Sequence, residues 1–158
     1  MTPDDGGAAP LIQTPALERG AQFSPDGKWI AYSITDGGRD EVYVTAVLSS
    51  SPTLTVGGGP WRVSNGGGRF PRWRADGREI FYSGPRAIMA VQVSAQSGFT
   101  AGAPVGVLRA NVSTSTLVSG FVDASRDGRE FLIARPVTST APRAPVSLLL
   151  NWTPDASR

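Results

Sequence analysis

The strongest constraint on the fold is a short turn signal that occurs three times. The Asp-Gly pairs that recur at matched spacing stand at Asp26–Gly27, Asp76–Gly77 and Asp127–Gly128. Successive pairs are separated by 50 and 51 residues. Strand-like sequence flanks each pair, as in "FSPDGKWIAY", "WRADGREIFY" and "ASRDGREFLI". Gly accepts a positive φ without a Cβ clash, so Asp-Gly between two such segments predicts a β-hairpin. We therefore predict three hairpins, one centred on each Asp.

Further strand-like segments follow these hairpins. A third segment follows each one, at residues 41–47, 87–93 and 145–152. A fourth follows the first two, at residues 61–64 and 104–108. An additional strand-like segment, residues 10–14, precedes the first hairpin. The pattern predicts four-stranded antiparallel meanders that repeat about every 50 residues.

Repetition at this length is typical of β-propellers, which arrange four-stranded sheets around an axis. A β-sandwich is the alternative, but it does not require turns at matched spacing. We predict an all-β fold with three propeller blades over residues 10–152, which is half of a six-bladed ring. Residues 1–9 are predicted to be a disordered lead-in, and residues 153–158 a tail.

The segment "FSPDGKWIAYS" resembles the repeat of TolB-type, WD-like propellers, in which a Ser-Pro-Asp-Gly turn joins two blade strands. Over residues 10–152 the chain is similar to the carboxy-terminal propeller blades of bacterial serine/threonine protein kinases. The resemblance implies the sensor or scaffold portion of a kinase-type receptor, on the extracytoplasmic side of a bacterial envelope. The resemblance concerns the fold and includes no motif that is specific for a ligand.

Composition argues against catalysis within this chain. There is no His and no Cys, which excludes His-based triads and thiolate chemistry from these residues. Kinase motifs are absent as well. We therefore predict a non-enzymatic module that recognises a protein or a small ligand, with no cofactor and no metal. The alternative is a part of a propeller hydrolase or peptidase whose catalytic residues lie outside this chain.

The net charge and the hydropathy of the chain bear on two kinds of partner, nucleic acid and a membrane. The net charge of +2 is too small to predict nucleic-acid binding. No segment is long and apolar enough for a membrane span. The opening "MTPDDGGAAP" lacks the basic and apolar segments of a signal peptide, and Met1 could be a start inside a longer parent sequence.

Arg72 and Arg74 are the best candidates for ligand contact. They flank Trp73 on a predicted innermost strand, so their side chains are expected on the face opposite its ring, which could look toward the central channel.

The remaining polar motifs are predicted to be structural. The Asp residues of the three Asp-Gly pairs are expected to cap their own turns rather than form an acidic ring. Residues 35–41, "TDGGRDE", are predicted to be an exposed turn rather than a calcium loop. The glycine-rich segments at 57–60 and 66–68 are predicted to be flexible loops.

Three blades do not close a ring, and an open array would expose the apolar faces of its end blades. Either further blades lie upstream in a longer parent chain, or two copies pair to complete six blades. We expect a homo-oligomer, most simply a dimer, in which the segment 10–14 of one chain supplies the outer strand missing from the third blade of the other.

Overall fold

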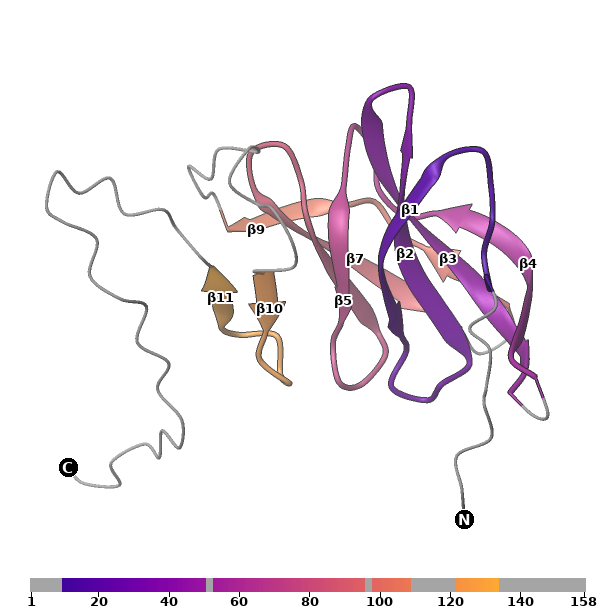
Figure 1. The fold of residues 1–158 in the computed structure, drawn as a ribbon. Helices are drawn as coiled ribbons and strands as arrows, with labels where there is room; N and C mark the ends of the chain where they lie inside the picture. Colours follow the sequence, from indigo (N-terminus) through magenta and orange to yellow (C-terminus); the bar gives the residue numbers. More distant parts are fainter. Residues whose placement is uncertain (1–9, 51–52, 96–97, 109–121, 134–158) are drawn as a thin grey trace, which may run out of the picture.

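The computed structural model describes residues 10–50, 53–95, 98–108 and 122–133 of the chain. Within these ranges the structure is all-β, with antiparallel sheets of four, five and two strands. The sheets follow one another along the chain and lie side by side (Figure 1). None of the described residues forms a helix that could cross a membrane. The predicted all-β class is confirmed for this part of the chain.

The first sheet, here called the first unit, is a meander of four strands. They are β1 (Leu17–Phe23), β2 (Trp29–Asp36), β3 (Arg39–Ser49) and β4 (Thr55–Arg62), paired in that order. The predicted third strand lies within β3. The predicted fourth strand was placed too late, because β4 already begins at Thr55 and ends at Arg62.

The glycine run at residues 57–60 is part of β4, so its prediction as a flexible loop was wrong. A Cβ at Gly59 would lie 2.6 Å from the Trp61 ring, so glycine is required for the indole to fold back over the strand. In this position Trp61 makes an edge-on contact with Trp29 of β2, with ring centroids 5.6 Å apart. The glycines therefore create space for an aromatic cluster, a role that composition alone does not reveal.

The second sheet, the second unit, contains five strands. They are β5 (Arg69–Trp73), β6 (Glu79–Ser83), β7 (Ile88–Ser94), β8 (Thr100–Ala101) and β9 (Val105–Leu108). Strands β5, β6 and β7 form the predicted meander, and β9 pairs with β7 as the predicted fourth strand. The short β8 also pairs with β7, at its end, and was not predicted.

The third unit is described only as the hairpin of β10 (Val122–Ala124) and β11 (Phe131–Ile133). The predicted third strand at 145–152, the lead-in at 1–9 and the tail at 153–158 lie outside the described residues. Residues 10–14 do not form the predicted additional strand. Instead, Leu11 and Ile12 border a groove on the outer face of the first sheet.

The first strands of the first two units share an irregularity. Pairing shifts register between Arg19 and Gln22 in β1, and between Arg69 and Arg72 in β5. Within each shift one residue has a positive φ, 63° at Gly20 and 54° at Phe70. These positions are equivalent, because each lies six residues before its Asp-Gly turn. The repeat therefore includes a β-bulge that bends the first strand of the unit.

Two apolar clusters join the units. The first lies between the first and second sheets and includes Ala31, Val44, Trp73, Ile80 and Tyr82. Phe99 of the second unit adds to it by packing against both Trp29 and Trp61, at centroid distances of 5.4 and 5.6 Å.

The second cluster joins the second unit to the third. Phe81 meets Phe131 edge to face at 5.1 Å, beside Ile88 and Ala90. The same β6 strand thus contributes Ile80 and Tyr82 to one neighbour and Phe81 to the other, as expected from the alternation of side chains along a strand.

Truncation of a side chain between the sheets should destabilise the protein strongly. Ile80 is fully buried in the first cluster. We expect Ile80→Ala to lower the free energy of unfolding by about 2–5 kcal/mol, because it removes apolar contacts and leaves a cavity. Leu48→Ala is the control, since Leu48 is 67% exposed. Urea unfolding measures both, and equal losses would contradict the described core.

Candidate functional site

The three Asp-Gly turns lie at one end of the molecule, at the lower edge of the described sheets in Figure 1. The second and third turns are in direct contact, since the Ala75 backbone N–H donates to the carbonyl of Arg126 at 3.2 Å. The loops β2–β3, β4–β5 and β6–β7 lie at the opposite end. We call these two ends the turn end and the loop end.

Two of the turns have the same hydrogen bonds. Asp26 Oδ1 accepts from the Ser24 hydroxyl at 2.6 Å and from the Lys28 backbone N–H at 3.1 Å. In the third unit, Asp127 accepts equivalent bonds from Ser125 and Arg129, also at 2.6 and 3.1 Å. The hydroxyl bond is the main cause that lowers the pKa of both carboxyls. These carboxylates are engaged within their own turns.

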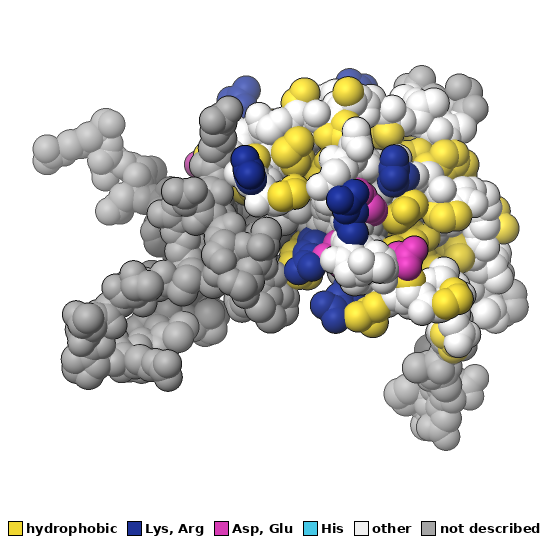
Figure 2. Space-filling model, turned by 90° about the horizontal axis from the view of Figure 1, so that it is seen from above, with side chains coloured by type: hydrophobic (Ala, Val, Ile, Leu, Met, Phe, Trp, Pro, Cys, Tyr) yellow, Lys and Arg dark blue, Asp and Glu magenta, His cyan; other side chains and the backbone are white. Residues whose placement is uncertain are grey.

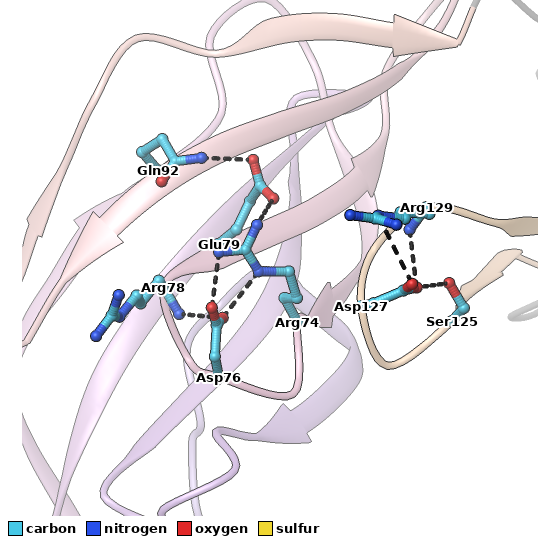
Figure 3. A network of polar contacts seen from close by, with 8 residues as sticks. All are labelled: Arg74, Asp76, Arg78, Glu79, Gln92, Ser125, Asp127 and Arg129. Carbon is cyan, nitrogen blue, oxygen red and sulfur yellow. Dashed lines mark hydrogen bonds and ion pairs between the residues drawn. The ribbon is translucent and has the colours of Figure 1, made fainter.

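In the second turn Arg74 takes the position of these serines. Its guanidinium binds both Asp76 oxygens, at 2.8 and 2.7 Å, and one oxygen of Glu79 at 2.8 Å. The other Glu79 oxygen accepts from Gln92 at 2.7 Å, which extends the network onto β7 (Figure 3). The Arg74 bond is the main cause that lowers the pKa of Asp76 to about 2. The charge of Arg74 is therefore shared with two carboxylates.

Arg72 and Arg74, the predicted ligand contacts, both lie at the junction with the third unit. Arg72 Nε is 3.8 Å from an Asp123 oxygen, and its Nη1 donates to the Pro71 carbonyl. The aliphatic part of Arg74 lies against Gly128, where an added Cβ would be 3.0 Å from Arg74 Cδ. Their contacts link neighbouring units, and the described residues do not enclose a channel around them.

A hollow of about 720 Å³ lies at the turn end, between the first hairpin and the second unit. Asp26 and Asp76 border it, but both carboxylates already accept hydrogen bonds inside their turns. Trp29 and Trp73 form part of its wall, and their indole N–H groups are buried with no acceptor among the residues that the structure describes. The buried N–H groups are closed off from the hollow by surrounding atoms.

The loop end contains a cavity of about 280 Å³ between the first and second units. Its walls come from the β2–β3 turn, the segment before β5 and the β6–β7 turn, and include Arg39, Asp40, Gly67, Arg69 and Ser83. Seen from above in Figure 2, this end carries several basic side chains next to fewer acidic ones. The cavity therefore combines positive charge with backbone groups of glycine-rich loops.

Asp40 organises this cavity. Its carboxylate accepts one hydrogen bond from the Thr35 hydroxyl and forms an ion pair with Arg69, which joins the first unit to the second. Its backbone carbonyl accepts from the Gly68 N–H at 2.8 Å. Asp40 is only 8% exposed, and the adjacent Glu41 is equally buried and accepts from the Ser64 hydroxyl.

The prediction of an exposed turn at residues 35–41 was therefore only partly right. Residues 36–39 are exposed, whereas Asp40 and Glu41 are buried, and Asp40 lies at the junction with the second unit. The sequence contains one signal of this burial, because the two acidic residues directly precede the apolar residues of a strand.

The glycine run at 66–68 is held by packing against the second unit. A Cβ at Gly68 would lie 2.8 Å from both the Tyr82 ring and Ser64 Cβ, so a larger residue does not fit. Burial raises the pKa of the Tyr82 hydroxyl to about 12, so this group stays protonated and uncharged. The cavity wall is thus anchored to the apolar core.

Comparisons of the chain with protein-family models, with curated proteins and with solved structures give no match. The candidate site is therefore defined by its geometry alone.

Acid should weaken the second turn. The pKa of Asp76 lies at about 2, below its usual 3.8, so the ionised form stabilises the fold above pH 3.8. This contribution is lost as the pH falls toward about 2. We expect Asp76→Asn to reduce the loss of stability between pH 4 and pH 2, measured by urea unfolding. An unchanged acid dependence would contradict the Arg74–Asp76 contact, and Asp36→Asn is the exposed control.

The Arg69–Asp40 pair should stabilise the junction of the units. We expect Arg69→Ala to cost about 1–3 kcal/mol, because it leaves a buried carboxylate without its cationic partner. Arg39→Ala, at the exposed start of β3, should change stability by less than about 0.5 kcal/mol. A double-mutant cycle with Asp40→Asn isolates the coupling between the two side chains. Additive effects would show that the pair does not stabilise the junction.

Proposed function

We propose that the chain is a non-enzymatic recognition module built from propeller-type blades, which binds a protein or a small ligand at its loop end. The observation that carries the proposal is the cavity bordered by loops of two successive units. Loops on a rigid sheet scaffold are the usual place for binding residues. The resemblance to kinase-attached propellers suggests that the module serves as the sensor or scaffold portion of a receptor.

Two features support the loop end over the turn end as the binding surface. At the turn end, Asp26, Asp76 and Arg74 are engaged with one another or with their own turns. At the loop end, Arg39 is exposed and Arg69 is 42% exposed beside its ion pair with Asp40. Two cationic side chains beside one carboxylate favour an acidic ligand.

The test is a titration of the ¹⁵N-labelled chain with three sets of short peptides, which are acidic, basic or apolar. We expect the acidic set to shift the amide signals of Gly38, Gly67 and Gly84, which line the cavity. Arg39→Ala should weaken the binding at least several-fold. Lys28→Ala, which removes an exposed cation at the turn end, is the matched control and should leave it unchanged.

Two results would contradict the proposal. The first is that no peptide set shifts the amides at the loop end, or that the shifts are confined to the turn end. The second is turnover of peptidase or glycosidase substrates by the purified chain, which would favour the hydrolase alternative over a binding module.

A further inference from the structure

The outer face of the first unit is less covered than the equivalent face of the second. Phe23 and Trp73 occupy equivalent positions, each three residues before an Asp-Gly turn. Trp73 is only 8% exposed, because the first unit packs against it. Phe23 is 50% exposed. The difference locates a face against which no sheet of the described residues packs.

This face contains an apolar groove of about 350 Å³. Its apolar lining includes Leu11, Ile12, Phe23, Ile30, Tyr32 and Leu54. The segment before β1 covers part of the face, and Ile30 and Tyr32 are buried beneath the groove. The groove therefore remains open beside Phe23, on the face that points away from the second unit.

The repeat indicates which surface fits such a face. Ile80 and Tyr82, the equivalents of Ile30 and Tyr32, belong to the cluster shared with the first unit. Phe81, between them, points the other way and meets the third unit. In each unit, therefore, the side chains at the Ile and Tyr positions face the preceding unit. The side chain between them faces the following unit.

In the third unit, the face that would meet a following unit has no neighbour among the described residues. Leu132 is equivalent to Phe81 and Ala31, since each lies five residues after the Asp of its turn. Leu132 is 71% exposed, whereas Phe81 and Ala31 are buried by the following unit. The exposed Leu132 of the third unit therefore complements the apolar groove beside Phe23 of the first unit.

We propose that two copies of the chain associate head to tail, with Leu132 of each copy docked in the groove beside Phe23 of the other. Because each copy contributes Leu132 to the other, a twofold axis relates the two copies, and the ring closes only if both docking sites of one copy are engaged at once. The count rests on the propeller arrangement proposed above: propellers typically contain four to eight blades, and six is the only multiple of three in that range. Two copies with three repeats each satisfy this condition.

The absence of cysteine from the chain allows a direct test by cross-linking. The variants Leu132→Cys and Phe23→Cys are prepared separately, mixed and oxidised under mild conditions. We expect a disulfide-linked dimer from the mixture. Leu48→Cys is the matched control, because Leu48 is an equally exposed leucine on the opposite face of the first sheet. Mixed with Phe23→Cys, it should give at least tenfold less product.

Sedimentation equilibrium of the unmodified chain provides the second readout. We expect twice the 16.6 kDa chain mass at micromolar concentration, with no larger species. Leu132→Lys should weaken the association at least tenfold while leaving the circular dichroism spectrum unchanged. A monomer at all concentrations, open-ended growth, or equal cross-linking by the Leu48→Cys control would each overturn the proposal.

Discussion

The face-to-face packing of successive sheets is the interaction on which the rest of the structure depends. A single sheet of four short strands has two apolar faces and cannot bury both of them by itself. Here Phe99 of the second unit packs against both Trp29 and Trp61 of the first, and Phe81 meets Phe131 of the third. These contacts hold the loops of neighbouring units together at one end and their turns at the other.

Backbone geometry keeps the units in equivalent positions. The Asp-Gly turns fix the register of each hairpin through bonds made by the Asp carboxylate itself. The positive φ values at Gly20 and Phe70 bend the first strand at the same place in two units. A Cβ at Gly20 would lie 3.4 Å from the Phe70 ring, so the two bends are in near contact. The repeat is therefore one of shape as well as sequence.

The sequence predicted the hairpins well and the loop end poorly, for a physical reason. Asp-Gly turns form through local bonds, so the turn at Asp26 could be recognised from neighbouring residues alone. The burial of Asp40 depends on Arg69, which lies 29 residues further along the chain. Likewise, the glycine segment at 57–60 belongs to a strand because β4 pairs with β3, and its glycines leave room for the Trp61 ring. The acidic pair Asp40–Glu41 before the strand is visible in the sequence, but the neighbouring residues do not identify Arg69 or β3 as the partner.

The most direct test of the stacked arrangement is a nuclear Overhauser experiment between aromatic rings of different units. The account predicts cross-peaks between Trp29 and Phe99, and between Phe81 and Phe131, whose ring centroids lie 5.4 and 5.1 Å apart. Absence of both sets of cross-peaks in the folded protein would contradict the account.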